Sequence, residues 1–161
     1  MGGRVGAWAC AARVRFAESH HRLAAGGHSR YSARMPPLLY VMLGGAVGSG
    51  FRYQISAIAL RNLGPGFPWG TWIINLLGGL LMGILAGVLS KQFTPDQSEP
   101  LRLLMGVGVL GGFTTFSAFS LEAANMLLRG QVLLATTYAV SSVAGSVMFV
   151  FAGLLLTRAL A

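Results

Sequence analysis

Residues 111–120 read GGFTTFSAFS and form a polar, glycine-rich interruption in a chain that is otherwise strongly apolar. The apolar residues on both sides of it resemble a single membrane helix. Inside a bilayer an unpaired backbone group costs several kcal/mol, so irregular backbone occurs there only where it lines a cavity or is buried in protein. Broken helices at mid-membrane depth recur as ion and substrate sites. The sequence therefore predicts the functional site at this interruption.

The composition also indicates a membrane protein. Of the 161 residues, 54% are hydrophobic and 10% are charged, whereas a soluble domain carries about 25% charged residues. The single cysteine, Cys10, excludes an internal disulfide framework, and all three histidines precede Met35. The common metal and nucleotide motifs are missing. No nucleophile–base pair is visible either, so we expect no enzymatic activity.

Residues 1–34 differ from the rest of the chain. They contain six arginines, one glutamate and no apolar run long enough to span a bilayer. Their composition resembles an organelle transit peptide, but we favour a simpler interpretation in which the protein starts at Met35. We therefore expect this basic leader, residues 1–34, to be either disordered or the result of an over-called start. Much of the net charge of +8 lies in it, so we expect no nucleic-acid partner.

From residue 35 onward the sequence predicts a single all-α integral membrane domain over residues 35–161. Four stretches approach the ~20 residues that a bilayer requires. They are Leu38–Leu60, Trp69–Leu89, Leu101–Leu128 and Val132–Leu156. The interruption lies in the third of them. Between the second and third, residues 90–100 are typical of a solvated turn.

Charge gives this domain no preferred orientation. In a chain with four spans, the positive charges after residue 35 divide evenly between the two sides of the membrane. One side has Lys91, Arg102 and Arg158, and the other has Arg52, Arg61 and Arg129. Such a chain could insert both ways, and two opposite copies could pair. Close helix contacts are predicted by glycines at helical spacing, namely Gly44 and Gly48, then Gly79, Gly83 and Gly87.

Polar side chains recur on the predicted spans four residues apart, which places them on one helix face. The second span has Thr71 and Asn75, and the fourth has Tyr138, Ser142 and Ser146. Hydroxyl side chains taken singly often bond to their own helix backbone. Three such stripes, counting the hydroxyls of the interruption, instead favour a polar path through the protein.

Arg52 and Glu122 are the ionisable side chains that lie well inside the predicted spans. Burial of either is costly, so each is a candidate functional residue. As alternatives, Arg52 could reach toward the interface, and Glu122 could accept hydrogen bonds from neighbouring hydroxyls. Phe116 and Phe119 share a helix face and are lipid-facing or core residues unless their positive ring edges contact an anion. Ring edges and uncharged donors would bind a small anion weakly enough to release it.

Three segments, in this order and spacing, resemble the CrcB/Fluc family of fluoride channels. They are residues 44–53 (GGAVGSGFRY), 70–78 (GTWIINLLG) and 111–122 (GGFTTFSAFSLE). The resemblance covers about Pro37 to the C-terminus. It implies four transmembrane helices with a break in the third, an antiparallel dual-topology homodimer, and passive fluoride export across the plasma membrane that lowers cytoplasmic fluoride. Ala118 departs from the hydroxyl residue expected there in many members.

The resemblance also implies roles for individual residues. It assigns a structural Na⁺ at the dimer interface to the backbone carbonyls of Gly111 and Thr114. The implied ion pathway comprises Phe116, Phe119, Asn75, Thr71, Tyr138, Ser142, Ser146, Glu122 and Arg52. The implied partners are fluoride, a second copy of the chain and the lipid bilayer. The implied location is the cell (inner) membrane, as a multi-pass protein.

Two other functions explain fewer of these features. A small dual-topology multidrug or cation transporter would require a carboxylate within the first span for proton coupling. The only charged residue in that span is Arg52. A non-conducting scaffold subunit would account for the glycine ridges but leaves the polar stripes unexplained.

Overall fold

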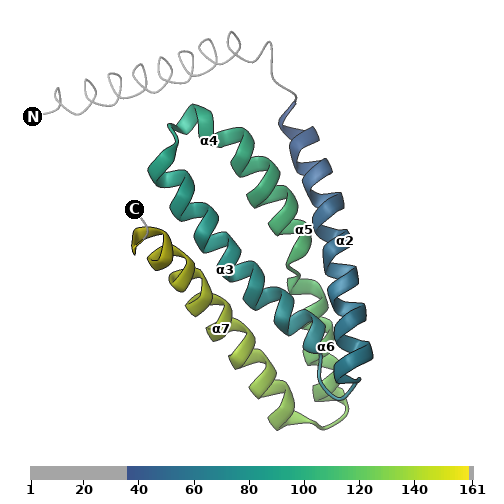
Figure 1. The fold of residues 1–161 in the computed structure, drawn as a ribbon. Coiled ribbons are helices and arrows are strands. Elements are labelled where there is room, and N and C mark those ends of the chain that lie inside the picture. The colour runs from purple at the N-terminus through teal and green to yellow at the C-terminus, as the bar shows by residue number, and fades with distance from the viewer. Residues whose placement is uncertain (1–35, 160–161) are drawn as a thin grey trace, which may run out of the picture. The chain divides into compact units, whose positions relative to one another are not determined.

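The computed structural model describes residues 36–159, with the backbone alone for residues 95–97. Within this part the chain is helical and has no strand, which confirms the all-α prediction (Figure 1). In chain order the elements are α2 (Pro37–Leu63), α3 (Trp69–Gln92), α4 (Pro95–Leu101), η1 (Arg102–Leu110), α5 (Gly111–Phe113), α6 (Phe116–Leu128) and α7 (Val132–Ala159). The predictions for the basic leader, residues 1–34, lie outside the described residues.

Three helical stretches of the described chain are long and apolar enough to cross a membrane. They are Trp69–Gln92, Ser98–Leu128 and Val132–Ala159. Helix α2 has 27 residues, which at ~1.5 Å per residue also exceeds the hydrocarbon thickness of a bilayer. It is not among the three, since its glycines and the sequence Arg52-Tyr53-Gln54 lower its hydropathy.

The backbone breaks at Thr114 and Thr115, inside the predicted interruption. Helix α5 ends at Phe113, and the next two residues are extended, with φ/ψ of −77°/158° and −150°/121°. Helix α6 then begins at Phe116, with the Thr115 hydroxyl as an N-cap that accepts a hydrogen bond from the N–H of Ala118. The prediction of a break in this apolar stretch is therefore confirmed.

The segment that leads to the break differs from the prediction. Residues 90–100 were expected to form a solvated turn, but α3 continues to Gln92 and Pro95–Leu101 is helical. A proline is favourable at the first position of a helix, where its missing N–H is not needed, and the N–H of Ser98 donates to the carbonyl of Thr94 at 2.9 Å. The following η1 is a wide π-helix, in which the N–H of Gly111 reaches back five residues to Gly106. Such segments are frequent at functional sites.

Glycines allow the helices to pack with their backbones in contact. A Cβ atom added at Gly44 or Gly48 of α2 would overlap backbone atoms of η1. On α3, a Cβ atom added at Gly83 would overlap the carbonyl group of Val150 on α7. Consequently α2 lies alongside η1 and α5, and α3 lies alongside α7 (Figure 1). The predicted tight contacts at these ridges are confirmed, and α3 connects the two pairs of helices.

Candidate functional site at the helix break

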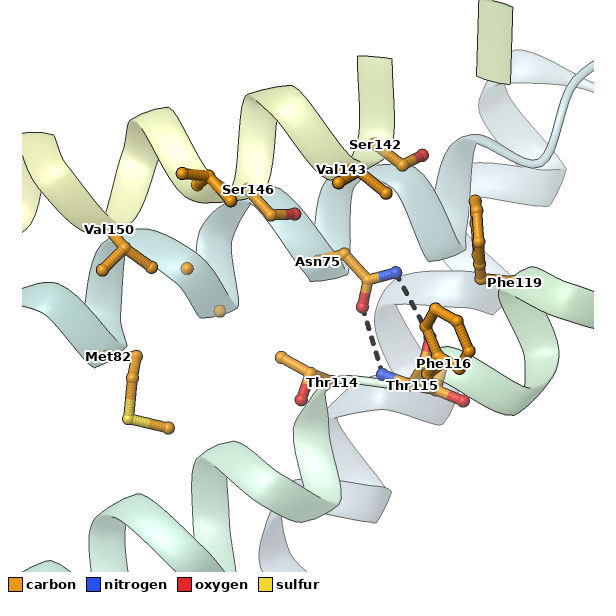
Figure 2. A pocket seen from close by; sticks show the side chains of 13 residues that line it. Asn75, Met82, Thr114, Thr115, Phe116, Phe119, Ser142, Val143, Ser146 and Val150 are labelled. Carbon is orange, nitrogen blue, oxygen red and sulfur yellow. Dashed lines mark hydrogen bonds between the residues drawn. The ribbon is translucent and has the colours of Figure 1, made fainter. Parts of the chain in front are cut away.

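A pocket of about 440 Å³ opens beside the break and is lined by α3, α6, α7 and the extended residues between α5 and α6 (Figure 2). It brings together the predicted site residues Asn75, Thr114, Phe116, Phe119, Ser142 and Ser146. Methionine, valine, glycine and Thr115 complete the lining, so no lining residue carries a charge. Three segments that are separated by more than 20 residues in the sequence thus converge at the predicted interruption.

Asn75 extends from α3 to the backbone of the break. Its Nδ2 donates to the carbonyl oxygen of Thr115 at 3.2 Å, and its Oδ1 accepts from the N–H of the same residue at 3.1 Å (Figure 2). In a continuous helix both backbone groups would bond to residues four positions away. One side-chain amide therefore satisfies both backbone polar groups of an extended residue, in addition to lining the pocket.

The two predicted pore phenylalanines differ in burial. Phe116 is 76% exposed and Phe119 is 9% exposed. Their ring centroids are 5.5 Å apart with an interplanar angle of 39°. Phe119 also lies 5.1 Å from the ring of Tyr138 and belongs to a buried cluster at the contact of α6 with α7. One ring is thus fixed by packing while the other borders open space.

Ser142 and Ser146 lie one turn apart on the wall that α7 contributes (Figure 2). Ser142 is 3% exposed, and its Oγ has no hydrogen-bond partner in the described part of the chain. An unsatisfied buried polar group costs ~1–3 kcal/mol, and native structures contain few of them. The pocket therefore contains a hydroxyl that is available to an entering group.

Glu122, Thr71 and Tyr138 form a second polar cluster, here named the carboxylate cluster. The Thr71 hydroxyl donates to Oε1 of Glu122 at 2.9 Å, and the Tyr138 hydroxyl donates to Oε2 at 2.7 Å. Thr71 is 6% exposed and Tyr138 is fully buried at 0%. The interpretation that Glu122 accepts hydrogen bonds from neighbouring hydroxyls is confirmed, while its place in an ion pathway stays a prediction.

The carboxylate cluster is separate from the pocket at the break. Thr71 and Glu122 line a smaller pocket of about 200 Å³ near the loop that joins α2 to α3, and the two pockets share no residue. Tyr138 connects the two regions, because its hydroxyl bonds Glu122 while its ring contacts Phe119. The predicted polar path is therefore divided into two clusters with an aromatic contact between them.

Three predicted site residues line neither pocket, and one of them is Tyr138, which connects the two regions. Arg52 is half-buried on α2 and lines neither of them, and Gly111 is exposed at the start of α5. Thr114, the other residue assigned to the cation by resemblance, does line the pocket at the break. The structure thus gathers most of the implied pathway but not the whole set.

Two further contacts were not predicted. In the first, the Thr115 hydroxyl caps α6. A threonine directly before a helix is a recognisable N-cap signal, so the sequence did offer a local indication of this contact. Its Oγ1 accepts the Ala118 N–H at 3.2 Å. Trp72 Nε1 donates to Ser141 Oγ at 3.1 Å and ties α3 to α7. No local sequence signal could have indicated this second contact, because it depends on the register of two packed helices.

The fold and the site define a helical membrane protein with an uncharged pocket at a broken helix. Residues 39–154 match the family described as "CrcB-like protein, Camphor Resistance (CrcB)", and the chain belongs to this family.

Its relatives align over nearly their whole length. It is 54% identical over 124 residues to a protein of Phenylobacterium zucineum, an alignment that covers 77% of this chain and 97% of that protein. It is 47% identical over 129 residues to a protein of Novosphingobium aromaticivorans, covering 79% of this chain and 100% of the relative. Both relatives are named fluoride-specific ion channel FluC.

Proposed function

We propose that the chain is a fluoride-selective ion channel that exports fluoride passively across the plasma membrane and so lowers cytoplasmic fluoride. The relatives named fluoride-specific ion channels support this, since they are 47–54% identical to the chain over nearly their whole length. The activity is ion conduction and not catalysis. The three apolar helices long enough to span a membrane agree with a multi-pass protein of the cell membrane.

The observation that carries the proposal is the uncharged pocket with an unpartnered hydroxyl. A small anion gives up part of its hydration shell to enter such a site, so the protein must offer replacement donors. The Ser142 hydroxyl is one of them. The side-chain amide nitrogen of Asn75 is another, since it has two N–H donors. Only one of them is used by the bond to the Thr115 carbonyl. The positive ring edges of Phe116 and Phe119 add weak attraction without a fixed cation that would trap the ion.

The carboxylate cluster extends this proposed pathway. An anion that passes Phe119 next meets Tyr138, whose hydroxyl is bonded to Glu122. The Tyr138 and Thr71 hydroxyls can turn from the carboxylate to the anion and back, since a hydroxyl proton rotates to suit its acceptor. Arg52, half-buried on the neighbouring helix, would attract anions toward one end of the path.

A dimer of opposite orientation is the assembly that we propose for the channel, with four membrane spans in each copy. Helix α2 is long enough to be the fourth. The even division of positive charge supports insertion both ways. Large apolar side chains remain exposed along the helices, including Leu133 at 82% and Met148 at 68%. Such faces suit contact with lipid or with a second copy.

A structural Na⁺ between the two copies is part of this proposal, and the residues at the break fit it. Carbonyl oxygens are suitable ligands for a hard cation, and a helix break releases carbonyls from the helical hydrogen-bond pattern. Gly111 and Thr114 are placed on either side of the point where that pattern stops. The cation would offset repulsion between the carbonyl dipoles of the two facing copies.

The alternative, a small dual-topology multidrug or cation transporter, has less support. Proton coupling would need a carboxylate in the first helix, and α2 contains no acidic residue. The relatives' names also favour the channel.

Fluoride efflux from liposomes tests the proposal. The full chain is reconstituted in vesicles loaded with potassium fluoride, and efflux is followed with a fluoride electrode after addition of a potassium ionophore. We expect rapid fluoride release and little chloride release from matched vesicles loaded with chloride. Equal permeability to both halides, or no release of either, would contradict the proposed function.

A further inference from the structure

Two backbone donors change partners at the break. In a continuous helix the N–H of Thr115 would bond the carbonyl of Gly111, four residues earlier. Here it donates to Asn75 Oδ1 at 3.1 Å. In the same way the N–H of Ala118 would bond the carbonyl of Thr114, but it donates to the Thr115 Oγ1 at 3.2 Å. In a continuous helix these two donors would have bonded the carbonyls of Gly111 and Thr114, which are among the four carbonyls of residues 111–114 that lose their helical donors at the break.

The change of partners begins at Thr115. The N–H of Thr114 still bonds the carbonyl of Leu110 at 3.0 Å, so the helical pattern is intact up to that residue. Beyond the break, α6 is a regular helix of 13 residues. Two of the N–H groups at the break are bonded by side-chain acceptors, the Asn75 amide oxygen and the Thr115 hydroxyl.

We propose that Asn75 and Thr115 are positioning residues that hold these two N–H groups away from the carbonyls of Gly111 and Thr114 and so keep both carbonyls free for a hard monovalent cation. The inference rests on the proposed function, since that is where the cation site is assigned. Asn75 then has a role besides lining the pocket: its amide connects α3 to Thr115, the residue that follows the proposed ligand Thr114. Neither residue contacts the cation itself through its side chain.

Asparagine is well suited to the first of these positions. Its amide oxygen accepts from the Thr115 N–H while its nitrogen donates to the Thr115 carbonyl at 3.2 Å, so the side chain is held at both ends. Leucine has a similar size but neither polar atom. Aspartate keeps an acceptor for the N–H and loses the donor. Comparison of asparagine, leucine and aspartate at this position therefore distinguishes the effect of the hydrogen bond to the Thr115 N–H from the effect of side-chain size.

The experiment measures cation binding without using fluoride flux. The full chain is purified in detergent with N-methylglucamine in place of sodium, and the thermal unfolding midpoint is followed as NaCl replaces the organic cation at constant ionic strength. A cation that binds only the folded dimer raises the midpoint with concentration. The quantity compared between variants is the Na⁺ concentration that gives half of the maximal shift.

We expect Asn75→Leu and Thr115→Val to raise this concentration about tenfold each, which corresponds to the loss of roughly one hydrogen bond. Asn75→Asp keeps the acceptor, so its Na⁺ requirement should stay at or below that of the unaltered chain. Thr136→Val is the matched control, because that exposed hydroxyl on α7 donates to the carbonyl of Val132 at 2.9 Å, far along the chain from the break. It should leave the Na⁺ requirement unchanged.

An unchanged Na⁺ requirement in Asn75→Leu and Thr115→Val would overturn the inference and leave the channel proposal intact. A rise in Asn75→Asp equal to that in Asn75→Leu would also overturn it, since the diverting acceptor would then not matter. If Asn75→Leu does not fold, Thr115→Val and Asn75→Asp still decide the question. The absence of any Na⁺ effect on the unaltered chain would overturn the cation site and the inference together, whereas fluoride efflux tests the channel separately.

Discussion

The two polar clusters of this protein differ in how far their hydrogen bonds are satisfied. In the carboxylate cluster, each oxygen of Glu122 accepts from one buried hydroxyl, at 2.9 Å and 2.7 Å. In the pocket at the break, the buried Ser142 hydroxyl has no partner among the described residues. Both clusters use uncharged hydroxyl donors, and the Phe119 ring of the pocket contacts the Tyr138 ring of the carboxylate cluster.

This difference suggests different contributions to conduction. A buried donor without a partner raises the free energy of the empty site, so an entering anion gains a hydrogen bond without breaking one. A donor already bonded to a carboxylate must exchange partners, which favours rapid release over tight holding. We therefore expect the pocket at the break to set halide binding, and the carboxylate cluster to contribute more to the stability of the fold.

The largest expected effect is at the two phenylalanines that line the pocket at the break. Phe116→Ile and Phe119→Ile should each abolish or sharply lower fluoride efflux from liposomes, because the ring edges that we propose to face the ion are lost. The proposed dimer should still assemble. Phe119→Ile should also lower the free energy of unfolding by about 1–2 kcal/mol, since that ring is 9% exposed. Phe116 is 76% exposed, so its replacement should affect flux alone.

Phe151→Ile is the matched control for both variants, because this α7 ring is 61% exposed and lines neither pocket. Efflux and the thermal unfolding midpoint are measured on the same preparations. Normal fluoride flux in Phe116→Ile and Phe119→Ile would remove the pore assignment and with it the proposed connection between the two clusters.

A second expected effect concerns the contribution of the carboxylate cluster to the stability of the fold. Tyr138→Phe keeps the ring against Phe119 and removes only the hydroxyl that donates to Glu122. Hydrogen bonds to charged groups contribute ~1.5–3 kcal/mol, so unfolding in detergent should become easier by about that amount. Tyr53→Phe, at a side chain 73% exposed, should change nothing. Equal stability of the two variants would show that Glu122 does not depend on Tyr138.

Thr71→Val tests whether the cluster acts as a unit. Loss of the Thr71 hydroxyl alone should lower the free energy of unfolding by ~1 kcal/mol, because Tyr138 still satisfies the second carboxylate oxygen of Glu122. Groups that share one partner are seldom additive, so the double variant with Tyr138→Phe should cost more than the sum. A double-mutant cycle on thermal unfolding measures this coupling, and strict additivity would contradict the picture of one cluster.

The sequence predicted the position of the break because its signal is local. Glycines and hydroxyl residues concentrated in residues 111–120 interrupt the apolar pattern of the spanning helix. The actual break is two residues long, at Thr114 and Thr115. The stripe of Thr71 and Asn75 was also recognised, because four-residue spacing places both on one face. Spacing alone could not predict which partner each of these two side chains bonds.

The remaining features depend on packing between helices. Asn75 reaches the Thr115 backbone, and Thr71 reaches Glu122, only because α3 sits in one register against the broken helix. The π-helical η1 has no composition that distinguishes it from an ordinary apolar helix. The short helix at Pro95–Leu101 is different, since proline after Thr94 is a local helix-start signal that was interpreted as a turn.

The smallest expected change in stability, and the sharpest test of the comparison, is Ser142→Ala. Removal of a buried hydroxyl without a partner should leave the free energy of unfolding unchanged or raise it by up to about 1 kcal/mol. Fluoride efflux should nevertheless fall several-fold, because the anion loses a donor that no other group was using. Ser120→Ala is the control, since that exposed hydroxyl donates to the Phe116 carbonyl at 2.8 Å. A marked loss of stability in Ser142→Ala would mean that the hydroxyl has a structural partner, and the contrast between the two clusters would then disappear.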